Sequence, residues 1–174
     1  NTHIPLEVDA ADWELKVGGA VTFPITLRIA DLKTQFPQME IVAVNECSGN
    51  SRGFVSPRVP GGQWGNGAMG NARWRGVSLK AVLDRAGVSA KAVQVMFNGL
   101  DEPGEEGIPD FAKALDIDVA RNGEVMLAYE MNGQPLPMLN GFPLRLIVPG
   151  YYGTYWVKHV SAVTVLTTTL DQFY

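Results

Sequence analysis

Apolar and polar residues alternate with a period of two along much of the chain, which is typical of β-strands that bury one face. Seven runs follow this pattern or are rich in β-branched residues. We expect strands over residues 13–17, 25–27, 40–44, 93–97, 125–129, 144–148 and 157–165. Asn132-Gly133 follows the fifth run and predicts a tight hairpin turn.

Helical spacing is confined to short segments. Ser78 stands where a helix N-cap belongs, apolar residues repeat behind it at helical spacing, and Gly87 favours a helix end, so we expect a helix over residues 78–86. A short helical stretch is expected near residues 30–33, and a short helix or turn over residues 111–121. Strands outnumber helices without regular alternation, and this pattern favours an α+β fold.

Residues 49–76 contain eight glycines and two prolines, and we interpret them as one long Gly-rich loop. Loops of this length in compact domains are usually functional. Glycine lets the backbone approach a ligand closely, and successive backbone amides can bind an anion. A surface loop with several turns would have the same composition, so the glycines alone do not identify a site.

Composition limits the class of protein. A chain of 174 residues that is 46% hydrophobic predicts one domain over residues 1–174. The net charge of −4 and the scattered basic residues argue against a nucleic-acid partner. No apolar run reaches the roughly 18 residues that span a bilayer. Asn1 begins no export signal. Because the chain starts without Met and ends at residues 171–174 directly after a strand-like run, we expect it to be truncated at both ends.

Cys47 is the only cysteine, and it follows a predicted strand at the point where the Gly-rich segment begins. One cysteine and two histidines are too few for a closed four-ligand zinc site. A lone cysteine is often a buried core residue, but nearby cations favour the thiolate that binds metals. The cations near Cys47 in the sequence are Arg52, Arg58, Arg73 and Arg75.

Five motifs, in the same order along the chain, resemble those of the sulfite oxidase family. Residues 45–52 (NECSGNSR) resemble its cysteine loop, and residues 64–74 (WGNGAMGNARW) resemble its glycine loop. The other motifs are residues 97–101 (FNGLD), residues 127–133 (LAYEMNG), and residues 140–150 (NGFPLRLIVPG) with the YWVK that follows at 155–158. Residues 61–64 (GGQW) and 138–141 (MLNG) are most similar to bacterial sulfite dehydrogenases that reduce a cytochrome.

The resemblance implies a mixed-sheet molybdopterin-binding fold with short helices. It also implies a molybdenum–molybdopterin cofactor whose metal is bound by the Cys47 thiolate, and no haem in this chain. The implied reaction oxidises sulfite to sulfate by oxygen-atom transfer and passes electrons to a c-type cytochrome, in the periplasm. An oligomer is possible, although the dimerisation domain that usually follows in the family is absent from this chain.

The motif positions imply roles for individual residues. Arg52 matches the arginine that binds the sulfur oxyanion, because a guanidinium can bind such an anion through two hydrogen bonds. Trp64 matches a tryptophan of the same pocket. The implied cofactor contacts, besides Cys47, are His3, Asp101, Asn140, Arg145, Trp156, Val157 and Lys158.

The chain departs from the family pattern at three places. Asn1 stands where an arginine is expected, and Asn140 stands where vertebrate enzymes have a histidine. The active-site tyrosine of the family would fall a few residues beyond Tyr174. Tyr151, Tyr152 and Tyr155 belong to a different loop, so we do not assign that role to any of them.

Two other functions stay open. The first is a sulfoxide reductase of the same fold, although Arg52 beside Trp64 favours an oxyanion over a neutral sulfoxide. The second is a cofactor-free interaction domain that kept the fold after losing catalysis. The presence or absence of bound molybdenum distinguishes this last interpretation from the two enzymes.

Overall fold

The computed structural model of the chain describes residues 3–4 and 8–171. The helices are short: α1 (Ile29–Gln35), α2 (Leu79–Ala86), α3 (Ile117–Ala120) and the 3-10 turns η1 (Arg52–Phe54), η2 (Met138–Asn140) and η3 (Gly153–Tyr155). The strands are β1 (His3–Ile4), β2 (Leu15–Gly19), β3 (Ile25–Leu27), β4 (Gln38–Glu46), β5 (Met69–Ser78), β6 (Gln94–Asn98), β7 (Glu102–Pro103), β8 (Ala112–Asp116), β9 (Met126–Met131), β10 (Gln134–Pro135), β11 (Arg145–Ile147) and β12 (Ala162–Leu166).

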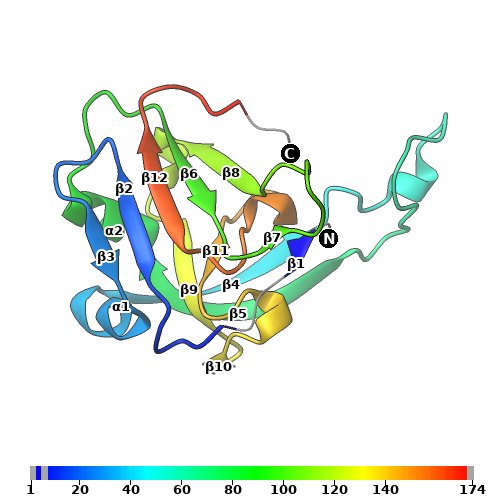
Figure 1. Ribbon diagram of the computed structural model, residues 1–174. Coiled ribbons are helices and arrows are strands. Elements are labelled where there is room, and N and C mark those ends of the chain that lie inside the picture. Colours follow the sequence, from blue (N-terminus) through cyan, green and yellow to red (C-terminus); the bar gives the residue numbers. More distant parts are fainter. Residues whose placement is uncertain (1–2, 5–7, 172–174) are drawn as a thin grey trace.

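The strands form two five-stranded sheets and the small pair β1–β7. One sheet has the order β3-β2-β12-β6-β8, in which β12 and β2 are parallel and the other pairs are antiparallel. The second sheet has the order β10-β9-β5-β4, with β11 also paired to β9. This arrangement confirms the predicted α+β class with mixed sheets (Figure 1).

One apolar core joins the two sheets. It includes Val17, Phe97 and Val163 from the first sheet and Trp74, Leu127 and Ile147 from the second. Helix α2 contacts β2 of the first sheet and β5 of the second, and it buries one apolar face made of Leu79, Val82, Leu83 and Ala86. The helix ends at Gly87, as expected, and this residue has φ +71.

Most of the predicted elements are confirmed. The strands that we expected before residue 150 are present with bounds within two residues, and the helix near residues 30–33 extends over α1. The hairpin turn at Asn132-Gly133 joins β9 to β10, and both turn residues have positive φ angles of 54° and 79°.

Three predictions were wrong in part. Residues 69–76 of the expected Gly-rich loop belong to β5, where Ala72, Trp74 and Gly76 face inward and alternate with exposed residues. Residues 112–116 form β8 rather than a helix, because they pair with β6, and only one helical turn follows. The last strand begins at Ala162 rather than at residue 157, because His159 has the left-handed φ of +51, which no strand permits.

The register of β5 against β9 shifts between Arg75 and Gly76. At this bulge, a Cβ atom on Gly76 would lie 2.0 Å from the carbonyl oxygen of Leu127 and 2.7 Å from the Cα of Ala128. Both of these atoms belong to the backbone of the central strand β9, so they cannot move aside without disturbing the sheet. Glycine is therefore required where β5 crosses the bulge.

We expect Gly76→Ala to lower the free energy of unfolding by about 1–3 kcal/mol, the usual range for overpacking a closed core. Gly70→Ala is the matched control, because Gly70 lies on the same strand with no atom within 4 Å of its added Cβ. That variant should change stability by less than about 0.5 kcal/mol. Urea unfolding followed by tryptophan fluorescence measures both, and equal losses would contradict the prediction.

Candidate functional site

Cys47 lies directly after β4 and is exposed. Its backbone N–H donates to the carbonyl oxygen of Ala68 (2.9 Å), and the N–H of Gly49 donates to its Sγ atom (3.4 Å). Cys47 lines a hollow of about 390 Å³ together with Trp64, Gly65, Asn66, Gly67 and Ala68. The thiol is therefore accessible, and the alternative of a buried core cysteine is excluded.

Residues 47–68 connect β4 to β5, and we call them the cysteine loop; in Figure 1 this loop projects from the body at the right. Asn50 holds the base of the loop closed. Its side-chain Oδ1 accepts from the N–H of Ala68 (2.9 Å), and its Nδ2 donates to Glu46 (2.8 Å). Sequence reasoning gave Asn50 no role, although it lies within the cysteine motif.

Arg52 lies on the cysteine loop with its guanidinium against two glycines. A Cβ atom on Gly61 would lie 2.2 Å from its Nη1, and a Cβ atom on Gly49 would lie 3.1 Å from its Cζ. Both glycines therefore leave the space that the guanidinium occupies. Because the amide of Gly49 also bonds the Cys47 sulfur, Arg52 and Cys47 contact the same turn of backbone. Trp64 is 55% exposed and lines the hollow beside Cys47.

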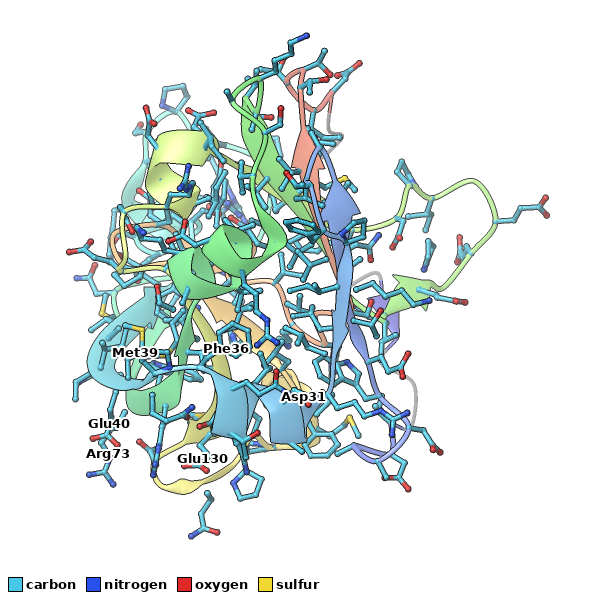
Figure 2. The ribbon with its side chains drawn as sticks, turned by 90° about the vertical axis from the view of Figure 1, so that its left-hand side faces the viewer. Asp31, Phe36, Met39, Glu40, Arg73 and Glu130 are labelled. Atoms are coloured by element: carbon cyan, nitrogen blue, oxygen red, sulfur yellow. The ribbon has the colours of Figure 1, made fainter. Side chains whose placement is uncertain are left out.

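Two of the four arginines near Cys47 in the sequence point elsewhere, which corrects our expectation that they act on the thiol. Arg73 forms a salt bridge with Glu40 (3.8 Å), and Figure 2 shows this pair together on the outside of the sheet. Arg75 forms a salt bridge with Glu130 (4.0 Å). The antiparallel register carries both arginines along β5 away from the cysteine end of β4.

Arg145 is a buried cation at the start of β11, with 6% of its surface exposed. Its Cζ atom lies 5.4 Å from the ring centre of Trp74 and 5.9 Å from that of Trp156, and these two rings pack edge to face. Its Nη1 donates to the carbonyl oxygen of Asn140 (3.1 Å), but its buried Nε has no hydrogen-bond partner in the described part of the chain. Burial lowers the pKa of Arg145 to about 10, so it stays charged at neutral pH.

Lys158 adds a second, half-buried cation to this region. Burial lowers its pKa, the charge of Arg145 lowers it further, and the carboxylate of Asp101 raises it in part. A Cβ atom on Gly99 would lie 2.4 Å from Oδ1 of Asp101 and 2.5 Å from the carbonyl oxygen of Lys158. Asp101 and Lys158 can therefore both pack against Gly99 only because it has no side chain. We call Asp101, Asn140, Arg145 and Lys158 the cation cluster.

The other predicted cofactor contacts lie around the cation cluster. Trp156 and Val157 are buried, each 1% exposed; Trp156 donates from Nε1 to the carbonyl oxygen of Tyr151 (3.1 Å), and the carbonyl of Val157 accepts from Leu146 (2.8 Å). His3 pairs with Pro103, two residues after Asp101, but its side chain lies outside what the structure describes, as do Asn1 and Tyr174.

The cysteine loop and the cation cluster are linked through Asn45. Asn45 precedes Cys47 by two residues, and a Cβ atom on Gly153 would lie 2.6 Å from its Oδ1. Gly153 begins η3, which leads directly to Trp156 and Lys158. The Nδ2 of Asn45 is buried without a partner within the described residues. The end of β4 thus packs against the loop that carries the second set of predicted contacts.

These two groups of residues fit an anionic, metal-carrying cofactor. Arg145 and Lys158 outnumber Asp101, so the cation cluster is net positive and suits a phosphate, while the Asp101 carboxylate can accept N–H bonds from a pterin. Cys47 offers an accessible sulfur ligand. Among residues 3–4 and 8–171, no three His, Cys, Asp or Glu side chains are grouped to hold a metal ion. A metal at Cys47 would therefore take its other ligands from the cofactor or from solvent.

Comparisons with known proteins agree with this fit. A family model described as "oxidoreductase molybdopterin binding domain" matches residues 1–174. The chain is 38% identical over 174 residues to mitochondrial sulfite oxidase of Mus musculus, and 35% identical over 173 residues to NADH nitrate reductase 1 of Nicotiana tabacum. Its structure is similar to that of the sulfane dehydrogenase SoxCD of Paracoccus pantotrophus, with a TM-score of 0.82 and 26% identity.

The relatives are longer than this chain. The two sequence alignments cover 94% of the chain but only 31% of the sulfite oxidase and 19% of the nitrate reductase. The structural match covers 97% of the chain and 41% of the sulfane dehydrogenase. As to membranes, none of the helices in the described segments is both long and apolar enough to cross a bilayer.

We expect Lys158→Met to raise the free energy of unfolding of the cofactor-free chain by up to about 1 kcal/mol after allowance for solvent screening, because burial and Arg145 both disfavour the Lys158 cation. Lys80→Met is the control, since Lys80 forms an exposed salt bridge with Asp84 and its loss should destabilise slightly. Urea unfolding measures both. Destabilisation by Lys158→Met would contradict the prediction.

Proposed function

Because the chain belongs to the family of oxidoreductase molybdopterin-binding domains, and within it to the sulfite oxidase family, we propose that it oxidises sulfite to sulfate with a molybdenum–molybdopterin cofactor held by Cys47. The observation that carries the proposal is the accessible Cys47 sulfur on the same turn of backbone as the Arg52 guanidinium. A sulfur atom that can bind a metal and a cation that can bind an oxyanion therefore lie in one loop.

The residues of this chain bind and orient, while the cofactor supplies the two-electron oxygen-atom transfer when bound. Arg52 binds the sulfite dianion through its guanidinium, for which the two glycines leave room, and lysine could not reproduce this planar geometry. Trp64 forms one wall of the substrate pocket and limits the access of water. Both side chains lie on the cysteine loop, so substrate binding depends on the closure of that loop by Asn50.

The cation cluster binds the other end of the cofactor. Arg145 and Lys158 hold the phosphate, Asp101 accepts hydrogen bonds from the pterin, and Asn140, Val157 and His3 complete the contacts. Trp156 supports Arg145 from the side. A bound phosphate also relieves the repulsion between Arg145 and Lys158, so cofactor binding stabilises the fold.

Nitrate reduction is a second candidate, because the nitrate reductase of Nicotiana tabacum is nearly as similar to this chain as the sulfite oxidase is. Nitrate is also an oxyanion, so Arg52 suits it as well. A neutral sulfoxide would gain less from the guanidinium, which places sulfoxide reduction third. We further propose, on the resemblance to bacterial sulfite dehydrogenases, that a c-type cytochrome in the periplasm accepts the electrons.

Metal and pterin analysis tests the proposed cofactor. Protein from a host that supplies molybdopterin should hold about one molybdenum and one pterin per chain, and Cys47→Ser should lose most of its molybdenum, since a hydroxyl is a poorer ligand than a thiolate. The control for folding uses cofactor-free protein: because the Cys47 side chain is exposed, Cys47→Ser should leave its unfolding midpoint unchanged. A chain without molybdenum would favour the cofactor-free interaction domain.

The substrate is tested on the metal-loaded, full-length protein. Sulfite should reduce an added cytochrome c or an artificial electron acceptor, and nitrate and methionine sulfoxide should not oxidise the reduced enzyme. If the loaded protein ignores sulfite but reduces nitrate, the proposed substrate is wrong while the proposed cofactor stands.

We expect Gly61→Ala to raise KM for sulfite roughly tenfold with a smaller change in kcat, because its methyl group would displace the Arg52 guanidinium. Gly123→Ala is the control for backbone strain: Gly123 has a similar positive φ (91° against 108°), nothing lies within 4 Å of its added Cβ, and it lies outside the cysteine loop. Steady-state kinetics of both variants separate displacement of Arg52 from backbone strain. An equal rise in KM in both would refute the role given to Gly61.

A further inference from the structure

Three segments of the cation cluster meet at one buried residue, His159. The segments are residues 98–101, which carry Asp101, residues 140–145, which carry Asn140 and Arg145, and the segment that contains Lys158. His159 is 2% exposed and follows Lys158 directly. None of the roles proposed above includes His159.

His159 makes hydrogen bonds to both of the other segments. Its Nδ1 lies 2.7 Å from the carbonyl oxygen of Phe142, and its backbone N–H donates to the carbonyl oxygen of Gly141 (3.2 Å). Its own carbonyl oxygen accepts from the N–H of Leu100 (3.0 Å). Because a carbonyl oxygen can only accept, Nδ1 carries the proton and acts as the donor. One residue therefore connects the neighbours of Asp101 and Asn140.

The backbone of His159 also fixes the position of Lys158. His159 has φ +51, a left-handed conformation that a side chain with a Cβ atom adopts only where its surroundings hold it. Lys158 passes close to two glycines: a Cβ atom on Gly141 would lie 3.0 Å from its Cα, and one on Gly99 would lie 2.5 Å from its carbonyl oxygen. Lys158 has little room to move as long as His159 stays in place.

We propose that His159 is a positioning residue for the cofactor, which holds Asp101, Asn140 and Lys158 in their binding geometry through the Nδ1–H···O bond to Phe142. This inference rests on the proposed cofactor but on no particular substrate. His159 itself need not touch the cofactor, and its effect is transmitted through the three segments that it joins. Partners of this indirect kind typically change metal affinity about 10- to 100-fold in proteins.

Two substitutions separate the hydrogen bond from the backbone conformation. His159→Asn keeps a side-chain N–H donor near the position of Nδ1 and tolerates the left-handed φ. His159→Gly accepts that φ even more readily but has no donor. Leu83→Ala is the control for stability, because Leu83 is fully buried in α2, which packs on β2 and β5, and its loss opens a cavity in the core.

The measurement is the molybdenum and pterin content of each purified variant, and the rate at which pterin is released from the folded protein below its unfolding temperature. We expect His159→Gly to release pterin roughly 10- to 100-fold faster than the unaltered chain. His159→Asn should release it at most about threefold faster. Leu83→Ala should lower the unfolding midpoint without changing the release rate in the folded state.

The outcomes distinguish this inference from the proposed function. If His159→Gly retains molybdenum and pterin as long as the unaltered chain does, His159 is an ordinary core residue; the inference is then overturned and the proposed function stands. Release that follows the unfolding midpoint equally in His159→Gly and Leu83→Ala would also overturn it. If the unaltered chain holds neither molybdenum nor pterin, both proposals are overturned.

Discussion

The guanidinium of Arg145 packs against the edge-to-face pair of Trp74 and Trp156, and this buried cation is the interaction on which the rest of the site depends. Trp74 comes from β5 of the second sheet, Trp156 from the loop before β12, and Arg145 from β11. Their packing joins the sheet to the loop that carries Lys158. A cation that is 6% exposed, and whose Nε has no hydrogen-bond partner among the described residues, is unfavourable unless an anion completes its surroundings. Arg145 therefore belongs both to the buried aromatic packing and to the cation cluster.

The cation cluster and the cysteine loop are stabilised in different ways. The cation cluster is surrounded by buried residues, and its segments pack closely because Gly99 and Gly141 have no side chains. The cysteine loop is more exposed and is held mainly by hydrogen bonds, such as those of Asn50. Such a division suits a cofactor that is retained permanently at one end and meets changing substrates at the other. Asn45, packed against Gly153, keeps the two parts in a fixed relation.

Sequence reasoning was most successful where signals are local. The alternation of β2, the helix spacing of α2 and the Asn-Gly turn each depend on neighbouring residues, and the motif around Cys47 identified its place at the end of a strand. It failed at β5, where glycines conceal the alternation and only the pairing with β4 and β9 fixes the strand. Sequence reasoning also could not predict contacts between residues far apart in the chain, because such contacts depend on how distant segments pair. Neither the salt bridge of Arg73 with Glu40 nor the meeting of three segments at His159 has a signal in any short window.

The exposed Cys47 also affects how the protein must be made and handled. No other cysteine is present in the chain, so an unliganded thiol cannot be protected by an internal disulfide. Air oxidation of cofactor-free material would instead link two copies through their Cys47 residues or convert the sulfur to its oxyacids. Either product would block the sulfur to which the proposed metal bond is made. We therefore expect cofactor insertion at Cys47 to need a reducing environment.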